Sequence, residues 1–370
     1  MRKVAIIPLL YKSYNYGGTL QYYALEKAIT DLGFETYVLN IDKYGEKIFQ
    51  KSEAPKSKRT FFARVIHKIL WEYCEYISKK EKINFNIRNE RFDKFRIDNV
   101  NCFCPNSLDE IDSSFFAFVA GSDQIWNPQW AKTTYFLNFV HQSKKIIYGA
   151  SVGRKELSEI QKQIYSNLLN HVDSVSVRET DISEQLQMFY HKSINTVIDP
   201  VFLIESKQWN KLIKKNYKFD KGYCFCYLIG DEPKYRKELK KKKDEYIVSI
   251  PYVTQKYIFN ENYANEMILE AGPSDFLELI LNAKYVITDS FHATAFSIIF
   301  HKQFFVLNRE LGNSQMLSRI TTLLEYFHLE NHLVDSIDDL PKDIPDWEKI
   351  DLKISELRKN SIEFLLESLN

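Results

Sequence analysis

The strongest constraint on the fold is a change of hydrophobic period that repeats along the chain. Residues 4–10 form a nearly continuous apolar run, which is typical of a strand buried on both faces. Apolar residues then recur at helical spacing from Leu20 to Leu32, Gly33 favours an end to that helix, and residues 34–41 indicate a second strand. A strand, a helix and a strand in this order predict a parallel sheet.

The same alternation returns after an interruption and continues through a second half of the chain. Residues 43–112 break the pattern, and an amphipathic stretch at 61–77 favours a helical insertion there. A second series of units begins at Tyr223. The predicted fold class is α/β, with two Rossmann-like, doubly wound domains that face a cleft. Further strands are expected at 115–120, 145–150, 174–177, 196–198, 223–229, 246–250, 285–288 and 304–307.

The expected domains follow from these two series. Residues 1–200 would form an N-terminal α/β domain, residues 201–345 a C-terminal α/β domain, and residues 346–370 an amphipathic C-terminal helix. Ligands of open α/β sheets bind outside the carboxyl ends of the strands. We therefore expect the functional residues among the polar residues that directly follow strands.

Composition and charge exclude several classes of protein. The 370 residues carry 50 Lys and Arg against 49 Asp and Glu, a net charge of +1, which argues against a dedicated nucleic-acid binder. No apolar stretch approaches the ~20 residues of a transmembrane helix, and the first apolar run is too short for a signal peptide. Five cysteines without C-x-x-C spacing argue against a disulfide framework or a zinc knuckle. We therefore expect a cytoplasmic protein.

The strongest candidate for chemistry follows the strand at 285–288. Asp289 is expected to cap the next helix, and His292 lies in its first turn. The positive end of the helix dipole disfavours an imidazolium there, so we expect the pKa of His292 to be lowered. A histidine that exchanges a proton readily at the end of a strand is a candidate general acid or base. The alternative is a histidine packed in the domain wall.

Two glycines follow the first strand, in a polar loop. Gly17 and Gly18 would let a ligand approach the backbone closely, and the following helix offers free N–H groups to an anion. With Asn15 and Tyr16 they form a candidate binding loop, although a tight turn explains the same residues. The loop matches neither a dinucleotide-binding nor a Walker motif.

A third polar segment follows the strand at 115–120. Asp123, Gln124 and Asn127 carry groups that bind sugar hydroxyls. Trp126 has a flat ring that could stack on a sugar. The segment therefore predicts a sugar site, with an Asx-capped loop around a packing tryptophan as the alternative.

Three arginines are candidates for binding an anion. Arg178 follows the strand at 174–177, Arg309 follows the strand at 304–307, and Arg319 lies on the next helix. The guanidinium fork matches carboxylate and phosphate with two parallel hydrogen bonds. The alternative for each is a surface arginine without a role.

Six segments occur in a set order: Asn15–Gln21, Ala120–Asn127, Gly149–Ser151, Ser176–Glu179, Asp199–Pro200 and Asp289–Thr294. Together they resemble the polysaccharide pyruvyl transferase family. The resemblance implies a two-domain fold like that of the GT-B glycosyltransferases. It implies phosphoenolpyruvate as the donor substrate, no further cofactor, and a pair of sugar hydroxyls as the acceptor. The product would be a pyruvate ketal on a cell-surface polysaccharide or its lipid-linked precursor, with release of phosphate.

The resemblance also suggests roles for single residues. His292 matches the family histidine that binds or protonates the donor, and Asp289 beside it is a second catalytic candidate. Ser290 stands where many members have an arginine. Donor binding would then involve Ser290 itself and the positive charges of Arg178, which matches the family's post-strand arginine, Arg309 and Arg319.

The two domains would divide the substrates between them. The C-terminal domain is expected on the donor side and the N-terminal domain on the acceptor side. No cluster has metal-ligand spacing, so no metal is expected. The acceptor-binding candidates are Asn15, Tyr16, Gly17, Gly18, Asp123, Gln124, Trp126, Asn127 and Ser151.

A basic segment bears on where the protein acts. Residues 207–243 are rich in Lys and Arg, which a solvated surface explains. The alternative is a peripheral contact with anionic headgroups of the inner membrane leaflet, where a lipid-linked acceptor would lie.

Two other functions fit the same architecture. One is a GT-B glycosyltransferase that uses a nucleotide sugar. The other is a non-catalytic glycan-binding relative, in which Ser290 reflects lost donor binding.

Overall fold

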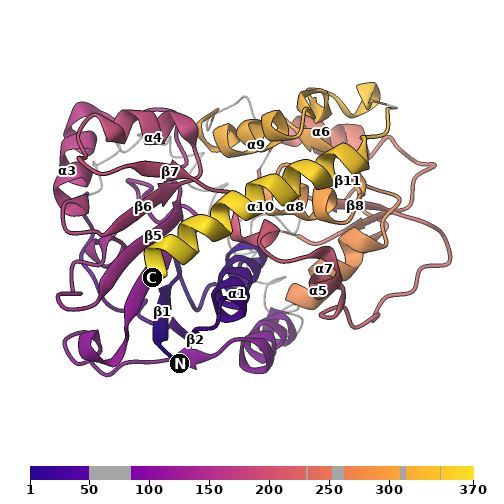
Figure 1. Ribbon diagram of the computed structural model, residues 1–370. Helices are drawn as coiled ribbons and strands as arrows, with labels where there is room; N and C mark the ends of the chain where they lie inside the picture. Colours follow the sequence, from indigo (N-terminus) through magenta and orange to yellow (C-terminus); the bar gives the residue numbers. More distant parts are fainter. Residues whose placement is uncertain (50–84, 231, 252–261, 309–313, 342) are drawn as a thin grey trace, which may run out of the picture.

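Two α/β domains lie side by side in the computed structural model, and one long C-terminal helix crosses both (Figure 1). The structure describes residues 1–49, 85–230, 232–251, 262–308, 314–341 and 343–370. Each domain contains one parallel sheet with helices packed against it.

The first sheet has seven strands in the order β3-β2-β1-β4-β5-β6-β7, and every neighbouring pair is parallel. The order reverses direction at β1, as in doubly wound folds. Helices α1 (Tyr16–Asp31), α3 (Glu159–Leu169) and α4 (Thr180–Gln187) belong to this domain. Its strands are β1 (Lys3–Ile7), β2 (Glu35–Leu39), β3 (Cys102–Phe103), β4 (Ala117–Gly121), β5 (Lys144–Ala150), β6 (Ser174–Val177) and β7 (Ile194–Thr196).

The second sheet has six parallel strands in the order β10-β9-β8-β11-β12-β13. Its strands are β8 (Cys224–Tyr227), β9 (Ile247–Ser249), β10 (Glu266–Met267), β11 (Tyr285–Thr288), β12 (Gln303–Leu307) and β13 (Leu333–Val334). The helices that follow the first sheet are α5 (Ser206–Asn210), α6 (Pro233–Leu239), α7 (Pro273–Leu281), α8 (Phe291–Ile299), α9 (Ser314–Tyr326) and α10 (Trp347–Leu369).

Short 3₁₀ helices complete the connections. They are η1 (Asp112–Ser114), η2 (Thr133–Phe136), η3 (Pro200–Phe202), η5 (Glu330–His332) and η6 (Ile337–Asp339).

The segment predicted as an insertion, 43–112, needs a correction. Residues 85–99 are helical, but the chain then enters β3, which pairs with β2 at the edge of the first sheet. The end of the segment is therefore part of the sheet. A two-residue strand carries too little hydrophobic pattern to be recognised in a sequence. The helix expected at 61–77 lies outside the described residues.

The domains are packed together around the start of α1. The hydroxyl of Tyr16 donates a hydrogen bond to Ala271 O in the C-terminal domain at 2.7 Å. The Tyr16 ring also stacks on Phe276 of α7, with 4.7 Å between ring centroids. These contacts bring the N-terminus of α1 against the second domain.

Helix α10 is anchored on both domains. The N–H of Ile198, just after the first sheet, donates to Ser361 Oγ at 3.0 Å. At the other end of the helix, Nε2 of His301 lies 2.9 Å from Asp351 Oδ1. The helix therefore joins the two sheets on one side of the molecule (Figure 1).

Candidate functional site

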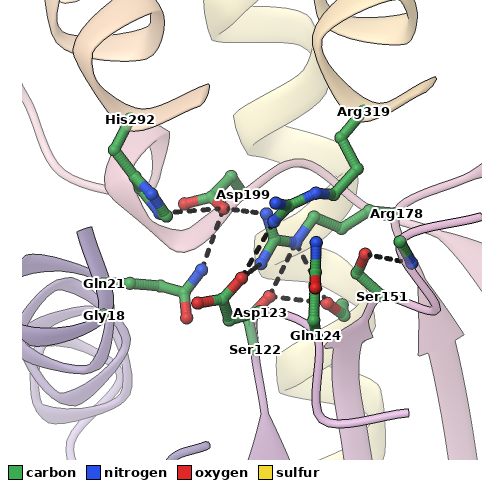
Figure 2. Close-up of polar contacts among 12 residues, drawn as sticks. Gly18, Gln21, Ser122, Asp123, Gln124, Ser151, Arg178, Asp199, His292 and Arg319 are labelled. Atoms are coloured by element: carbon green, nitrogen blue, oxygen red, sulfur yellow. Dashed lines mark hydrogen bonds and ion pairs between the residues drawn. The ribbon is translucent and has the colours of Figure 1, made fainter. Parts of the chain in front are cut away.

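Five charged or ionisable side chains meet between the two domains (Figure 2). Three follow strands of the first sheet, and two come from α8 and α9 of the second domain. This arrangement follows from the parallel sheets, because the carboxyl ends of their strands face the space between the domains. We call these residues the polar cluster: Asp123, Arg178, Asp199, His292 and Arg319.

Arg178 is the buried centre of the polar cluster. Its Nη1 lies 2.5 Å from Asp199 Oδ2, in an ion pair without hydrogen-bond geometry. Its Nε donates to Ser122 Oγ at 2.9 Å and to Gly149 O at 3.2 Å. Among the described residues, neither Nη1 nor Nη2 has a hydrogen-bond partner. Arg178 is therefore held by Nε, and its fork has hydrogen-bonding capacity to spare.

Arg319 comes from the opposite domain and shares a carboxylate with Arg178. Arg319 Nη1 lies 2.9 Å from Asp123 Oδ1, and Arg178 Nη2 lies 3.8 Å from the same oxygen. Both guanidinium carbons also lie over the ring of Phe291, 5.3 Å and 5.4 Å from its centroid. Asp123 and Phe291 thereby offset the repulsion between two like charges.

The pKa values in the polar cluster reflect this balance. Burial alone would raise the pKa of Asp123, but Arg319 and Arg178 outweigh it and lower the pKa. For His292, burial is the main cause of a lowered pKa, Arg178 and Arg319 lower it further, and Asp199 and Asp123 oppose them. The predicted direction for His292 is found, with burial rather than the helix dipole as its main cause. The imidazole is therefore neutral at pH 7.

His292 is held between α1 and Asp199. Its Nε2 lies 3.8 Å from Asp199 Oδ2, which is beyond hydrogen-bond distance. On the α1 side, the imidazole lies directly against Gly17, where a Cβ would lie 2.0 Å from Nδ1. A glycine at position 17 is thus needed for α1 to pack against the histidine, whether or not a ligand also approaches the backbone there.

A cleft of about 480 Å³ opens beside the polar cluster. It is lined by apolar and aromatic side chains and by the ionisable side chains of Asp123, His292, Arg319, Lys47 and Lys132. A larger cavity of about 940 Å³ lies between α9 and the start of α10, but no member of the polar cluster lines it. We therefore take the smaller cleft as the candidate active site. Its apolar and aromatic lining is Leu9, Leu10, Trp130, Tyr135, Tyr227, Ile229, Phe276 and Phe291.

The structure brings many of the predicted residues to this cleft. Arg178 lies behind them as part of the polar cluster. Gln124, with its amide oxygen turned toward Arg319, accepts hydrogen bonds from Nε at 3.2 Å and Nη2 at 2.6 Å. The predicted residues that line the cleft are Asn15, Gly17, Asp123, Gln124, Ser290, His292 and Arg319.

Trp126 is not available to a ligand, which contradicts its predicted stacking on a sugar. The ring is fully buried and stacks on Phe136, with centroids 5.1 Å apart and an interplanar angle of 5°. Trp130, four residues later, lines the cleft instead. Its Nε1 donates to Gln124 O at 2.8 Å, which orients the ring. The alternative of a packing tryptophan in a capped loop was therefore correct for Trp126.

Three more acceptor candidates point into the protein. Tyr16 is buried in the domain interface described above. Ser151 is fully buried and donates to Glu179 Oε1 at 2.5 Å. Asn127 is buried, and its Oδ1 accepts from the N–H of Gln129 at 3.1 Å. These side chains support the loops around the site without lining the cleft.

Gly18 and Asp289 take positions other than those predicted. Gly18 N–H donates to Asn15 Oδ1 at 2.9 Å within the cap of α1, and Gly18 is absent from the lining of this cleft. Asp289 does not cap α8, since Ser290 is the N-cap residue and accepts from Ala293 N–H. The carboxylate of Asp289 accepts from the N–H groups of Ile229 and Gly230 at 2.6 Å and 2.7 Å.

Arg309 cannot be placed, because it lies outside the described residues.

Sequence reasoning missed several residues of the site. Asp199 was noted within a motif but given no role, although it follows a strand as the other site residues do. Gln21, one turn into α1, donates to Asp199 Oδ2 at 3.0 Å and had no signal of its own in the sequence. Trp130 and Phe291 were hidden because an aromatic residue in a loop or helix has no pattern that separates core from ligand surface.

Two features are absent from the described residues: a cluster of metal-ligating side chains and a membrane-spanning helix. In this part of the chain, no group of three or more His, Cys, Asp or Glu side chains could hold a metal ion. No described helix has the length and apolar character needed to cross a membrane.

Comparison with known proteins gives a family and a fold. The family model for polysaccharide pyruvyl transferase matches residues 15–310. A search among curated proteins found no match.

Solved structures align with most of this chain at low sequence identity. A co-structure of S. aureus MnaA with UDP aligns with a TM-score of 0.51 at 14% identity, over 99% of this chain and 91% of that chain. A putative UDP-N-acetylglucosamine 2-epimerase from Listeria monocytogenes aligns with a TM-score of 0.48 at 12% identity, over 99% and 90%. The E. coli heptosyltransferase WaaC with ADP gives 0.38 at 11%, over 85% and 89%. The predicted GT-B-like architecture of two doubly wound domains is confirmed.

Proposed function

The chain belongs to the polysaccharide pyruvyl transferase family, and on that basis we propose that it transfers the enolpyruvyl group of phosphoenolpyruvate to a pair of sugar hydroxyls. The product is a pyruvate ketal on a cell-surface polysaccharide or on its lipid-linked precursor, and phosphate is released. One observation carries this proposal. Two arginines from opposite domains meet at Asp123, beside a neutral histidine in the interdomain cleft.

The donor would bind where the polar cluster lines the cleft, at Asp123, His292 and Arg319. Phosphoenolpyruvate has a carboxylate and a phosphate, and both are natural partners for the forks of Arg178 and Arg319. The N-termini of α1 and α8 meet there, since Gly17 lies against His292, and each helix presents the positive end of its dipole. We expect this positive charge to take the place of the arginine that many family members have at the position of Ser290.

The acceptor would lie along the aromatic wall. Trp130 offers a flat face for a sugar ring, and Asp123 and Gln124 offer hydrogen-bond partners for its hydroxyls. These three residues belong to the N-terminal domain, whereas His292 and Arg319 belong to the C-terminal domain. The proposed donor and acceptor sides therefore meet across the cleft.

The reaction can be written with every proton placed. His292, protonated once the donor is bound, gives its proton to the methylene carbon of the enol, which becomes a methyl group. The first sugar hydroxyl forms a bond to the neighbouring carbon and returns its proton to His292. Phosphate leaves with the electrons of its C–O bond, and the second hydroxyl closes the ring and loses its proton to phosphate. A positioned acid and base of this kind contributes about 10²–10⁴ in rate.

The charges around the reacting groups have two roles in this mechanism. The negative charges of the donor favour the imidazolium form of His292, which burial disfavours in the free enzyme. Arg178 and Arg319 stabilise the charge that develops on the leaving phosphate. The proposal requires no cofactor besides phosphoenolpyruvate as donor substrate.

A thermal-shift panel tests the proposal directly. Phosphoenolpyruvate, pyruvate, phosphate and UDP-, GDP- and CMP-sugars would be compared on the wild type and on Arg178→Ala. A ligand at 100 times its Kd stabilises the fold by about 2.7 kcal/mol, which is visible as a rise in Tm. We expect a shift with phosphoenolpyruvate that is lost in the variant, followed by acceptor-dependent phosphate release.

The other outcomes lead to the two rival functions. A shift with nucleotide sugars and none with phosphoenolpyruvate would reject the proposal in favour of a glycosyltransferase. A protein that binds glycan in the absence of turnover, and equally well as His292→Ala, would be a non-catalytic relative.

The proposed place of action is the cytoplasmic face of the membrane, where a lipid-linked acceptor would be presented. The basic segment 207–243 would attract anionic headgroups. Two of its lysines, however, already have partners within the protein. Lys242 pairs with Asp338 at 3.1 Å, and Lys234 donates to Asp335 O at 2.6 Å. Association with anionic vesicles that is lost at high salt would support this placement, and equal association with neutral vesicles would reject it.

A further inference from the structure

The two ring nitrogens of His292 have different surroundings. Nε2 is buried, has no hydrogen-bond partner among the described residues, and lies nearest to Asp199 Oδ2. Nδ1 lies beside Gly17, and both residues line the cleft. Among the described residues, Nε2 is the ring nitrogen that is buried without a partner, so Nδ1, beside Gly17 at the edge of the cleft, is the nitrogen left for the substrate.

Asp199 is held in place by three residues, of which Gln21 and Arg178 are seen in Figure 2. Its Oδ1 accepts from the N–H of Val201 at 3.0 Å. Its Oδ2 accepts from Gln21 Nε2 at 3.0 Å and pairs with Arg178 Nη1 at 2.5 Å. The carboxylate is nearly inaccessible to water, so solvent screens its charge little. His292 is the remaining neighbour of Oδ2, at 3.8 Å.

We propose that Asp199 is a positioning residue that turns the Nε2–H of His292 toward Oδ2, so that Nδ1 is the nitrogen that exchanges protons with the substrate. The proposal rests on the function proposed above. On this proposal, donor binding also changes the protonation of His292. An anionic donor that binds Arg178 competes with Asp199 for that guanidinium, which frees Oδ2 to accept from Nε2–H and favours the imidazolium.

The groups around His292 set the sign of each effect. Asp199 and Asp123 face it as anions and raise its pKa, whereas Arg178 and Arg319 face it as cations and lower it. From α1 it meets Gly17, and Gln21 on the same helix carries no charge. Removing the charge of Asp199 therefore lowers the pKa of His292, and removing the Gln21 donor, which competes for Oδ2, raises it.

Nuclear magnetic resonance of ¹⁵N-labelled histidine tests this without turnover. His292→Gln assigns the His292 signals, and wild type, Asp199→Asn and Gln21→Leu are titrated with and without phosphoenolpyruvate, in the absence of acceptor. We expect the Nε2–H tautomer in the wild type and a pKa about one unit or more lower in Asp199→Asn. We expect a higher pKa in Gln21→Leu, and a rise on adding phosphoenolpyruvate in the wild type that Asp199→Asn lacks.

The two variants separate positioning from damage. Asp199→Asn keeps the Oδ1 acceptor for Val201 N–H, and Gln21→Leu keeps the charge, so loss of folding would move both the same way. An Nδ1–H tautomer, or pKa values that do not move in opposite directions, would overturn the proposal. If the wild type gives no thermal shift with phosphoenolpyruvate, the proposed function has failed, while the tautomer and the two variants still test the role of Asp199.

Kinetics add a second readout where the enzyme turns over. Asp199→Asn should lower kcat and displace the pH profile of kcat, because the protonation of His292 has changed. An unchanged pH profile with a reduced kcat would mark Asp199 as merely structural.

Discussion

Gly17 on α1 and His292 on α8 touch so closely that a Cβ on the glycine would lie 2.0 Å from Nδ1 of the imidazole. A helix start in the first domain and a helix start in the second are thus joined without an intervening side chain. The neighbouring Gly18 is different, since its Cβ would have Ser13 Oγ as its nearest atom, at 3.6 Å. These two glycines form a matched pair.

The first prediction uses that pair. Gly17→Ala should displace His292 and reduce turnover by about 10²–10⁴, the contribution of a positioned acid and base, with about 1–3 kcal/mol of destabilisation from overpacking. Gly18→Ala should have a much smaller effect on both, because the methyl group has ordinary contact distances. Turnover and Tm of the two variants check this. Equal losses would show that the contact with His292 is unimportant.

The second prediction concerns the donor. Arg319→Gln should raise the KM for phosphoenolpyruvate at least about tenfold, because a charge-assisted hydrogen bond contributes about 1.5–3 kcal/mol. The Tm shift caused by phosphoenolpyruvate should shrink accordingly. Arg154→Gln, which changes an arginine outside the lining of the cleft, is the control. A KM for phosphoenolpyruvate that is the same in both variants would remove Arg319 from the donor site.

The third prediction separates two tryptophans. Trp130→Ala should raise the KM for the sugar acceptor and leave the thermal shift with phosphoenolpyruvate intact, because the ring lines the apolar wall of the cleft. Trp126→Ala should lower the free energy of unfolding by about 3–5 kcal/mol, because that ring is in the core. Acceptor kinetics and chemical denaturation measure the two effects. If Trp130→Ala left the acceptor KM unchanged, the aromatic wall would not be the sugar platform.

The fourth prediction is a pH dependence of stability. Burial raises the pKa of Glu26 on α1 from 4.5 to about 7. A carboxyl group with a raised pKa contributes stability at low pH that is lost as the pH rises from about 4.5 through about 7. Glu26→Gln, which keeps an oxygen for the N–H of Asn101, should therefore raise the Tm at pH 8 and change it little at pH 4.

A surface carboxylate gives the control for this effect. Glu159 is largely exposed and pairs with Lys162 at 2.7 Å, so Glu159→Gln should change the Tm little at either pH. Melting curves at pH 4, 6 and 8 for both variants provide the measurement. A Tm difference for Glu26→Gln that does not grow with pH would contradict the assignment.

The sequence predicted the sheets well because hydrophobic period is a local property. Each long strand was recognisable from its own residues, as the buried run of β1 or β11 shows. The short strands β3, β10 and β13 were not, since a strand with two backbone pairs needs no hydrophobic pattern.

The site was predicted in part for the same reason. Arg178 follows β6 of the first sheet and His292 lies just after β11 of the second, and each parallel sheet brings such residues to the edge formed by the carboxyl ends of its strands. Asp199 also follows a strand, but its role depends on its contacts with Gln21, Arg178 and His292. Those partners are at least 21 residues away in the sequence, so no local motif indicates that they contact Asp199.

What the sequence determined by itself is the alternation of strands and helices, and with it two parallel sheets whose strand ends face one cleft. What the tertiary structure decided is which polar and aromatic side chains face that cleft. Trp130 and not Trp126 lines it, and Ser290 and not Asp289 caps α8. The physical reason is that periodic burial is set by neighbours in the chain, whereas a loop side chain takes the orientation that its distant partners allow.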